Sequence, residues 1–506
     1  MILILSFGGQ TAHLIARRVR DLGVYSEVMP CDISLTEIGK LRPDGIILSG
    51  GPSSVYEHNA PLMSKKVLDL KILTLGICYG EQLIGKFVGG TVLAGKLKEF
   101  GKKELVVKKN GKLLKGLSKN EQVWMSHGDL VAELPKDFEI LASTDACPIA
   151  AFESKDRKIY GIQFHAEVAH TPKGNQILKN FVFDICKTKK DWEIRDLPKK
   201  LVKEIRKEVR NNAVIMGVSG GVDSTVAATL LHKAIGNKIY CVFVDHGLMR
   251  KNELEEVKTY FEKKLSFKHF FVVDASSIFL EKLNGVTDPE QKRKIIGHTF
   301  IEVFENKVLE LEKEHKNIKF LGQGTIYPDR IESGQPSKYA SKIKSHHNLT
   351  LPDKMRLKVI EPLKEFYKDE VRKLGKELRI PEEILNRHPF PGPGLSIRIL
   401  GGITEERLEI LKEADYIFIE ELKKSGYYDK MWQAFAALIP VKTVGVMGDA
   451  RTYEYIISLR AVTSVDAMTA DWAKLPQELL EMISNRIINE VRGVNRVLYD
   501  ISQKPP

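Results

Sequence analysis

One cysteine stands in a setting that could expose it as a nucleophile. The segment Gly76-Ile-Cys78-Tyr-Gly80 follows an apolar run and precedes a helix-like stretch, Glu81–Val88. Glycines two residues before and two residues after Cys78 would let the backbone turn sharply and present the thiol at a helix N-terminus. The helix dipole there favours the thiolate. A buried structural cysteine is the alternative, because that is the common fate of an unpaired cysteine.

A histidine and a glutamate elsewhere in the chain could complete a catalytic set with this cysteine. The strand-like run Gly161–Glu167 ends in His165-Ala-Glu167. Side chains two residues apart on a strand share one face, so we expect the Glu167 carboxylate to orient the His165 imidazole. A histidine that activates a thiol and a carboxylate that orients the histidine form a nucleophilic triad.

A second Gly-rich segment could bind phosphate. It follows the strand-like run Ala213–Val218 and consists of Ser219, Gly220, Gly221, Val222, Asp223 and Ser224. Glycines let backbone N–H groups approach phosphate, the serine hydroxyls add donors, and a following helix N-terminus adds positive potential. The Asp223 carboxylate could hold Mg²⁺ against the phosphates. No lysine follows, so this is not a G-x-x-x-x-G-K-[ST] loop, and a generic Gly-rich turn is the alternative.

The elements that must position these residues indicate an α/β fold. In residues 1–188, apolar runs alternate with Gly-containing loops and predict buried parallel strands at Ile2–Leu5, Gly45–Leu48 and Ile72–Leu75. The run Ile239–Val244 follows the phosphate-binding candidate after a helix-like stretch, which predicts a second βαβ unit. The charged stretch Lys187–Arg210 is expected to be helical and to link the two units.

A third unit is expected to begin near the Pro-rich segment His388–Gly394. Three prolines and two glycines there exclude regular structure and indicate a boundary or a rigid binding loop. Beyond it, strands are predicted at Val441–Met447 and Tyr453–Thr463, and a helix at Pro476–Arg492. At roughly 100–200 residues per domain, the chain length also suggests about three domains.

The composition is that of a globular protein with a basic surface. The formal net charge is +12 and the isoelectric point about 9.1. This charge is compatible with nucleic-acid binding, but no arginine-rich arm or RNA motif occurs. We therefore favour a lysine-rich surface with pockets for anionic small molecules, and we expect neither a nucleic-acid nor a membrane partner.

The cysteines and the apolar runs predict where the protein resides. Five cysteines are scattered without a C-x-x-C pair, which argues against a disulfide framework and a zinc site and for the cytoplasm. No apolar run reaches the ~18 residues of a membrane helix. The opening run Met1–Phe7 lacks a basic flank and a cleavage site, so it is predicted to be a first strand rather than a signal peptide.

Three segments together resemble the class I glutamine amidotransferases. They are Leu48–Pro52, the turn at Cys78, and Phe164–Glu167. The resemblance implies that Cys78 is the nucleophile, that His165 is its base, and that Glu167 orients the base.

The same resemblance implies further roles on the glutamine side. The backbone N–H groups of Gly51 and Tyr79 would form the oxyanion hole, and Val123–Asp129 would be a second loop beside the glutamine. Ala166 stands where the family usually has proline, and Ser6 where an aspartate is usual. Neither departure removes a member of the triad.

The segment Ser219–Ser224 resembles the loop of the ATP pyrophosphatases, which several enzyme families share. Longer stretches resemble the GMP synthetases, namely Val244–Arg250, Gly285–Gly297, Gly322–Ser333, Ile343–Asn348, His388–Gly394, Met447–Tyr453 and Asn495–Asp500. This resemblance implies a ligase that aminates XMP to GMP with ATP, through adenyl-XMP, using ammonia released from glutamine.

The family resemblance also implies a domain order. A class I glutamine amidotransferase domain would occupy residues 1–190. An ATP pyrophosphatase domain of the adenine-nucleotide α-hydrolase-like (PP-loop) type, with a doubly wound parallel sheet, would occupy residues 191–387. A small α+β domain that binds XMP and forms a homodimer would occupy residues 388–506.

Residue roles in the synthetase half follow from the same resemblance. Arg293, Gln433 and Lys504 would contact XMP, and Asp329, Glu332 and Lys344 would lie in a mobile segment that completes the adenylylation site. The cofactor would be Mg²⁺ bound with ATP. A solvated basic loop is the alternative for Lys344, and the match thins after His347.

Three other functions are alternatives to this one. An NAD synthetase would share the Ser-Gly-Gly loop but carry an unrelated glutaminase. An RNA-thiolating or RNA-binding protein would want a cysteine pair that handles sulfur, which the chain lacks. A non-catalytic nucleotide-binding regulator would not need Cys78, His165 and Glu167 intact.

The family usually continues for a few residues beyond a Lys-Pro-Pro, with Thr-Ile-Glu and an aromatic residue. Here the printed sequence stops at Pro506. Because Lys504 would then lie at a fraying end, we expect a chain of this length to bind XMP less well.

Overall fold

The computed structural model describes residues 1–9, 11–333, 357–447, 450–463 and 471–503. The chain divides into two compact units. The first contains Met1–Glu193, and the second contains Ile194–Arg330 and the described residues from 357 onward. The domain boundaries expected near residues 190 and 388 remain predictions, and each unit is described by itself.

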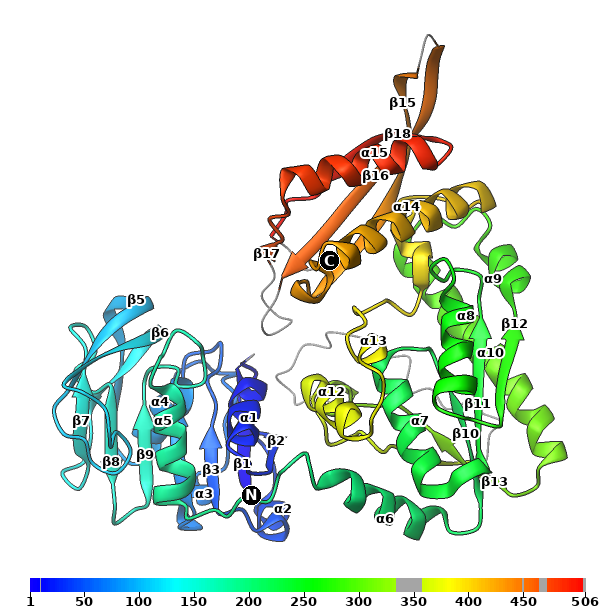
Figure 1. The fold of residues 1–506 in the computed structure, drawn as a ribbon. Coiled ribbons are helices and arrows are strands. Elements are labelled where there is room, and N and C mark those ends of the chain that lie inside the picture. The colour runs from blue at the N-terminus through cyan, green and yellow to red at the C-terminus, as the bar shows by residue number, and fades with distance from the viewer. Residues whose placement is uncertain (10, 334–356, 448–449, 464–470, 504–506) are drawn as a thin grey trace. The chain divides into compact units, whose positions relative to one another are not determined.

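The first unit is built on a nine-stranded sheet in the order β2-β1-β3-β4-β9-β8-β7-β5-β6 (Figure 1). Neighbours from β2 to β9 pair in parallel, and neighbours from β9 to β6 pair antiparallel. Residues 2–5 of β1 and all of β3 are buried, as expected for parallel strands that helices cover on both faces. The carboxyl ends of β3, β4 and β9 therefore lie side by side at one edge.

The elements of the first unit are β1 (Ile2–Ser6), α1 (Ala12–Asp21), β2 (Ser26–Pro30), α2 (Leu35–Leu41), β3 (Gly45–Leu48), α3 (Lys66–Asp69), β4 (Leu73–Ile77), α4 (Tyr79–Phe87), β5 (Thr91–Val107), β6 (Asn120–Glu133), β7 (Glu139–Ser143), β8 (Ala151–Ser154), β9 (Ile159–Ile162), α5 (Gly174–Lys179) and a π-helix, η1 (Asn180–Ile185).

The second unit begins with a five-stranded parallel sheet in the order β12-β11-β10-β13-β14. The central strand β10 is followed in the chain by β11 on one side and, later, by β13 on the other. Such a reversal of strand order opens a crevice at the carboxyl ends of the two strands, and ligands of doubly wound sheets bind there.

The elements of this part are α6 (Leu197–Val209), β10 (Ala213–Gly217), α7 (Val222–Ile235), η2 (Gly236–Lys238), β11 (Ile239–Asp245), α8 (Glu253–Lys258), η3 (Thr259–Lys264), β12 (Phe270–Asp274), α9 (Ser276–Leu283), α10 (Pro289–Glu314), β13 (Ile318–Gly322), α11 (Tyr327–Ser333), β14 (Lys358–Ile360), α12 (Lys368–Glu377) and α13 (Glu382–Leu385).

The end of the chain adds a second, smaller sheet to this unit. Strand β16 pairs antiparallel with β15 and β17 and parallel with β18. Buried side chains of both sheets, among them Val242 and Leu459, belong to one hydrophobic core. In Figure 1, β15 and β16 extend together beyond α15 as a two-stranded arm.

The elements of this last part are η5 (Gly394–Arg398), α14 (Glu405–Lys424), η6 (Tyr428–Lys430), β15 (Gln433–Met447), β16 (Ala450–Thr463), β17 (Asp471–Trp472), α15 (Gln477–Glu490) and β18 (Val494–Tyr499).

The structure corrects some expected element bounds. The charged stretch Lys187–Arg210 is helical only over α6, which begins at Leu197 with a proline in its first turn. The strand expected at Ile72–Leu75 is β4, which runs on to Ile77 and so leads directly into Cys78. The strand expected through Gly161–Glu167 ends at Ile162.

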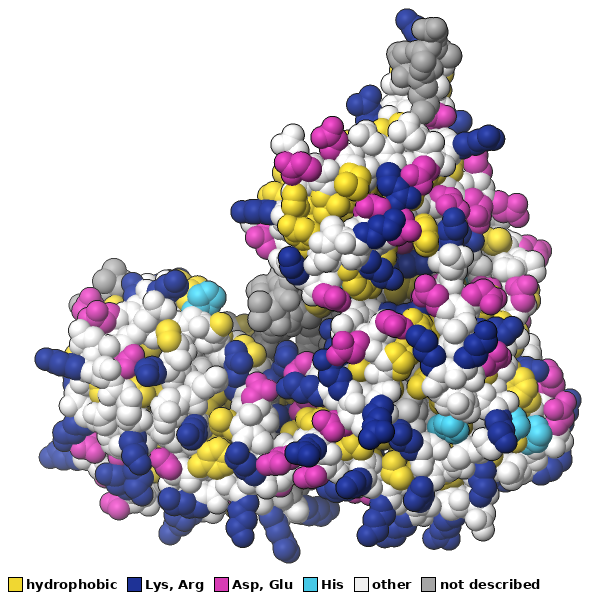
Figure 2. Space-filling view, viewed as in Figure 1, with side chains coloured by type: hydrophobic (Ala, Val, Ile, Leu, Met, Phe, Trp, Pro, Cys, Tyr) yellow, Lys and Arg dark blue, Asp and Glu magenta, His cyan; other side chains and the backbone are white. Residues whose placement is uncertain are grey.

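The surface carries charge of both signs. Figure 2 shows Lys and Arg side chains over both units, with Asp and Glu side chains among them on the visible face. Among the described helices, none combines the length and apolarity needed to cross a bilayer.

Candidate active sites

Cys78 lies in a strained turn between β4 and α4. Its φ is +53° and its ψ −109°, a conformation that L side chains rarely adopt. A Cβ on Gly76 would lie 2.6 Å from the carbonyl oxygen of Gly80, and a Cβ on Gly80 would lie 2.4 Å from the carbonyl oxygen of Leu48. No side chain fits at either position, so the sharp turn predicted from the two glycines is present.

His165 and Glu167 form a buried hydrogen-bonded pair beside this turn. His165 Nδ1 lies 2.7 Å from Glu167 Oε1. A Cβ built on Gly50 would lie 3.1 Å from His165 Cε1 and 3.7 Å from Cys78 Cβ. The imidazole and the nucleophile thus adjoin the same glycine at the carboxyl ends of the parallel strands.

The expectation that His165 and Glu167 lie on one face of a strand is wrong, because β9 ends at Ile162. Beyond Ile162 the backbone finds new partners: the His165 N–H donates to the Trp124 carbonyl (3.0 Å), and the Thr171 hydroxyl donates to the His165 carbonyl (2.6 Å). Arg18 Nε donates to the Glu167 carbonyl at 3.0 Å. These hydrogen bonds, two of them to residues far away in the sequence, bring the two side chains together, and strand periodicity does not.

The electrostatics of the pair favour proton transfer from the thiol. Burial alone would lower the pKa of His165, but the Glu167 carboxylate and the neighbouring Cys78 raise this pKa well above its ordinary value. An imidazole with a raised pKa accepts a proton more readily, and Glu167 holds the resulting charge.

Glu81 is a buried carboxyl group next to the nucleophile that the sequence reasoning missed. It lies in the first turn of α4, and neither of its carboxyl oxygens has a hydrogen-bond partner in the described part of the chain. Burial, with the nearby Cys78, raises its pKa well above the usual value, which favours the uncharged form. An uncharged Glu81 does not oppose a thiolate at Cys78. The sequence could have indicated Glu81, because it is an acidic residue only three positions after Cys78.

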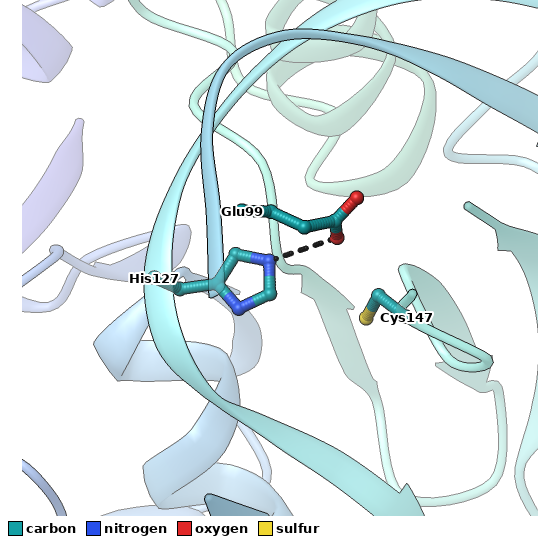
Figure 3. Close-up of side chains that lie close together, drawn as sticks. All are labelled: Glu99, His127 and Cys147. Atoms are coloured by element: carbon teal, nitrogen blue, oxygen red, sulfur yellow. Dashed lines mark hydrogen bonds and ion pairs between the residues drawn. The ribbon is translucent and has the colours of Figure 1, made fainter. Parts of the chain in front are cut away.

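A hydrogen-bonded network around Glu99 and His127 holds the strand that carries Ser126, and Cys147 lies beside this pair (Figure 3). His127 Nε2 lies 3.2 Å from Glu99 Oε2, and Nδ1 lies 2.9 Å from the carbonyl oxygen of Asp129. A carbonyl can only accept, so His127 carries a proton on Nδ1.

Every polar group of this network has a partner within the protein. The Thr144 hydroxyl donates to Glu99 at 2.9 Å, and the Cys147 thiol donates to the Ile149 carbonyl at 3.3 Å. One potential ligand atom each from Glu99, His127 and Cys147 lies within 4.8 Å of the other two, a spacing that could admit a metal ion. Each of these side chains already has a hydrogen-bond partner in the protein, so their closeness needs no metal. The network therefore fixes the segment that places the Ser126 carbonyl 3.7 Å from Cys78 Sγ.

The two residues expected to form the oxyanion hole lie against each other. A Cβ on Gly51 would lie 3.2 Å from Tyr79 Cγ and 2.9 Å from the Phe7 carbonyl oxygen. Gly51 follows β3, and Tyr79 opens α4 directly after Cys78. Gly51 thus packs against the Tyr79 side chain at the edge where Cys78 stands.

The phosphate-binding candidate lies at the strand-order reversal of the second unit. It joins β10 to α7, and Gly221 is the N-cap of that helix. Gly220 has φ +72°, and a Cβ there would lie 2.4 Å from Val257 Cγ2. Across the crevice, a Cβ on Gly324, beyond β13, would lie 3.3 Å from the backbone of Ser224. The loop is therefore a close-packed turn between β10 and α7, and phosphate binding by it stays a prediction.

Side chains and neighbouring groups fix the shape of this loop. The Ser219 N–H donates to Ser224 Oγ (3.3 Å), and the Gly221 N–H donates to Ser219 Oγ (3.3 Å). Arg387 Nη1 donates to the Gly220 carbonyl at 3.1 Å. Arg387, which the sequence reasoning did not single out, thus ties the loop to the segment preceding His388.

The Asp223 carboxylate fits a divalent cation. Its Oδ2 pairs with Lys368 Nζ at 3.2 Å, while its buried Oδ1 has no hydrogen-bond partner in the described part of the chain. An unpartnered carboxylate oxygen at a phosphate-binding loop is the type of ligand that Mg²⁺ takes.

The residues expected to contact XMP are partly described. Arg293 lies on α10, half-buried, with Nη1 3.0 Å from Glu290 Oε1. Gln433 opens β15 and donates from Nε2 to the Pro389 carbonyl at 2.7 Å. Lys504 lies outside the described residues.

Of the residues expected to complete the adenylylation site, Asp329 is described. It lies in the first turn of α11, where its Oδ2 accepts from the Ile326 N–H at 3.1 Å. The side chain of Glu332 and all of Lys344 lie outside the described residues.

These features define two classes of active centre: a class I glutamine amidotransferase triad and a PP-loop of the ATP pyrophosphatase type. Family comparisons agree, matching "Glutamine amidotransferase class-I" at residues 3–185, "NAD synthase" at residues 193–296 and "GMP synthase C terminal domain" at residues 420–506.

Relatives match over the whole chain. The chain is 55% identical to "GMP synthase [glutamine-hydrolyzing]" of Aquifex aeolicus, and 54% identical to the proteins of that name from Carboxydothermus hydrogenoformans and Caldicellulosiruptor saccharolyticus. Each match covers 100% of this chain and 98% of the relative. The chain therefore belongs to the glutamine-hydrolysing GMP synthase family.

Glu167→Gln should slow glutamine hydrolysis by about 10²-fold to 10⁴-fold, because the amide cannot hold the imidazolium that forms at His165. The measurement is glutamate release by the full chain at saturating glutamine. Glu153→Gln removes another buried carboxylate of the same unit and should leave this rate nearly unchanged. Equal rates for Glu167→Gln and the unsubstituted protein would exclude the orienting role.

Proposed function

We propose that this chain makes GMP from XMP, with Cys78, His165 and Glu167 releasing ammonia from glutamine and the Ser219–Ser224 loop binding the ATP that activates XMP. The observation that carries the proposal is the strained Cys78 beside a paired His165 and Glu167, in a chain more than half identical to GMP synthases along its whole length. In this reading the enzyme is a carbon–nitrogen ligase.

The glutaminase half uses covalent catalysis. The Cys78 thiol gives its proton to His165, and the thiolate attacks the carboxamide carbon of glutamine. The Gly51 and Tyr79 N–H groups stabilise the oxyanion. The C–N bond breaks as His165 protonates the leaving nitrogen, so ammonia departs and a glutamyl thioester remains. Water activated by His165 then hydrolyses the thioester to glutamate and restores the thiol.

The synthetase half activates a poor leaving group. The C2 oxygen of XMP attacks the α-phosphorus of ATP, the bond to pyrophosphate breaks, and adenyl-XMP forms. Ammonia adds at C2, AMP leaves, and GMP remains. The Ser219–Ser224 loop and the N-terminus of α7 would bind the pyrophosphate part of ATP. Mg²⁺, held by Asp223, would neutralise charge on the phosphates.

The XMP site is proposed from the family resemblance and from the positions described above. Arg293 and Gln433 would contact XMP together with Lys504. Asp329, Glu332 and Lys344 would complete the site around the phosphates. Asp329 supports this in one respect, because it lies on α11, the helix that follows β13 beyond the edge of the sheet where the loop lies.

Cys78→Ala should abolish GMP synthesis from glutamine and keep synthesis from added ammonium chloride, because the two chemistries use separate residues. GMP formation is measured with each nitrogen donor at saturating XMP and ATP. Cys186→Ala removes a buried thiol of the same unit that has no proposed part in catalysis, and it should keep both activities. Loss of the ammonia-driven activity in a folded Cys78→Ala protein would contradict the division of roles.

Asp223→Asn should abolish pyrophosphate release while leaving basal glutaminase activity measurable, because a divalent ion needs an anionic oxygen. Pyrophosphate is followed over a range of Mg²⁺ concentrations. Asp274→Asn, at the end of β12 in the same sheet, is the matched control and should retain activity. If the Asp223→Asn protein released pyrophosphate at an undiminished rate at low Mg²⁺, Asp223 would be excluded as a metal ligand.

The protein should be a homodimer through residues beyond 388. Of the sixteen exposed large hydrophobic side chains found among the described residues, eight lie in this last part, including Val441, Val444 and Tyr453 on the projecting arm. Figure 2 shows hydrophobic side chains gathered in the region of α15 and β17. Light scattering at micromolar concentration should give twice the monomer mass, and a monomer would contradict the proposal.

A further inference from the structure

A lysine side chain of the second unit, Lys292, is buried and has no ion pair with any carboxylate among the described residues. Lys292, on α10, has 1% of its surface exposed. Its ammonium donates to three backbone carbonyls, those of Ser396 (2.9 Å), Ile399 (2.9 Å) and Gly401 (2.6 Å). In the described part of the chain, burial alone lowers its pKa, and no acidic group opposes that effect.

The geometry requires the charged form. An ammonium has three donors and no lone pair, and here each donor has one carbonyl acceptor. A neutral amine would offer only two donors and would turn its lone pair toward the third carbonyl. Burying an ammonium is costly unless its hydrogen bonds are satisfied, so the three carbonyls must stay in place.

The three carbonyls belong to the second half of a segment whose first half contains three prolines. Residues 388–401, called here the Pro-rich segment, run from His388 through η5 to Gly401. At its other end, the Gln433 amide donates to the Pro389 carbonyl, and the Ala434 N–H donates to His388 Nδ1 at 3.1 Å. The segment is thus held on one side by α10 and on the other by β15.

Both anchoring elements carry a residue of the proposed XMP site. Arg293 follows Lys292 directly on α10, and Gln433 is itself the anchor on β15. Successive residues on a helix point about 100° apart, so fixing the direction of Lys292 also fixes the rotation of α10 and the direction of Arg293.

We propose that Lys292 is a positioning residue of the XMP site, which sets the placement of Arg293 relative to Gln433 by clamping α10 to the Pro-rich segment. The inference rests on the proposed function, because that function assigns Arg293 and Gln433 to XMP. An apolar side chain of the same length would take one donor from each of the three carbonyls, leave the Ile399 carbonyl with only the Gly401 N–H (2.9 Å), and release the clamp.

The test uses the full chain with ammonium chloride as the nitrogen donor. Lys292→Met should raise the KM for XMP by roughly 10-fold or more, because small misplacements of binding groups are costly. The KM for ATP and basal glutaminase activity should change by less than about 2-fold. Lys294→Met removes the same charge from an exposed position two residues along α10 and should leave the KM for XMP unchanged.

A second measurement separates positioning from a general loss of structure. In Lys292→Met, amide hydrogen exchange without substrates should be faster in residues 395–401 and unchanged in β10 and α7. If Lys292→Met does not fold, Lys292→Gln, whose amide keeps two of the three donors, takes its place in both measurements with the same expected directions.

Two outcomes would overturn the proposal. One is an unchanged KM for XMP in the Lys292 variant while Arg293→Met raises it. The other is an equal rise in the KM values for XMP and ATP, which would mark a structural role alone. If Arg293→Met itself leaves the KM for XMP unchanged, the assignment of α10 to the XMP site fails, and that failure is distinguishable from failure of the clamp.

Discussion

The architecture of the glutaminase depends on one close approach of two backbones. Gly80, at the start of α4, rests on the carbonyl of Leu48 at the end of β3, and even a single Cβ would come within 2.4 Å of that oxygen. This contact allows the turn that forces Cys78 into positive φ. Hydrogen bonds support the strain, because the Cys78 N–H donates to the Ile162 carbonyl (2.9 Å) and the Gly80 N–H donates to the Ser49 carbonyl (3.1 Å). Cys78, Gly51 and the turn at His165 converge where these parallel strands end.

The loop of the second unit depends on the same kind of close packing around a glycine. Its Ser219–Ser224 loop also follows a parallel strand, and Gly220 also packs too closely for a side chain, here against Val257. Arg387 and Lys368 bring cationic groups from later in the chain to the loop and to Asp223. Joining the two chemistries in one chain has a chemical reason: ammonia attacks carbon only when unprotonated, and in neutral water most of it is ammonium.

Local sequence signals predicted the parts of these sites that depend on local geometry. The turn at Cys78 and the loop at Ser219–Ser224 could be predicted because glycine spacing beside an apolar run restricts the backbone directly. The placement of His165 and Glu167 could not, because their turn is held by hydrogen bonds from His165 to Trp124 and from Arg18 to Glu167, both far away in the sequence. Lys292 gave no signal either, since its acceptors lie more than one hundred residues away. A lysine in a charged helical stretch is ordinarily read as exposed.

The most direct test of the account is the fate of the glutamine amide nitrogen. The chain is incubated with XMP, ATP, Mg²⁺ and glutamine labelled with nitrogen-15 at the amide, and the purine product is examined by mass spectrometry. The account predicts GMP carrying the label on its 2-amino group, together with AMP, pyrophosphate and glutamate in equal amounts. Glutamate release without labelled GMP, under conditions in which ATP is available, would contradict it.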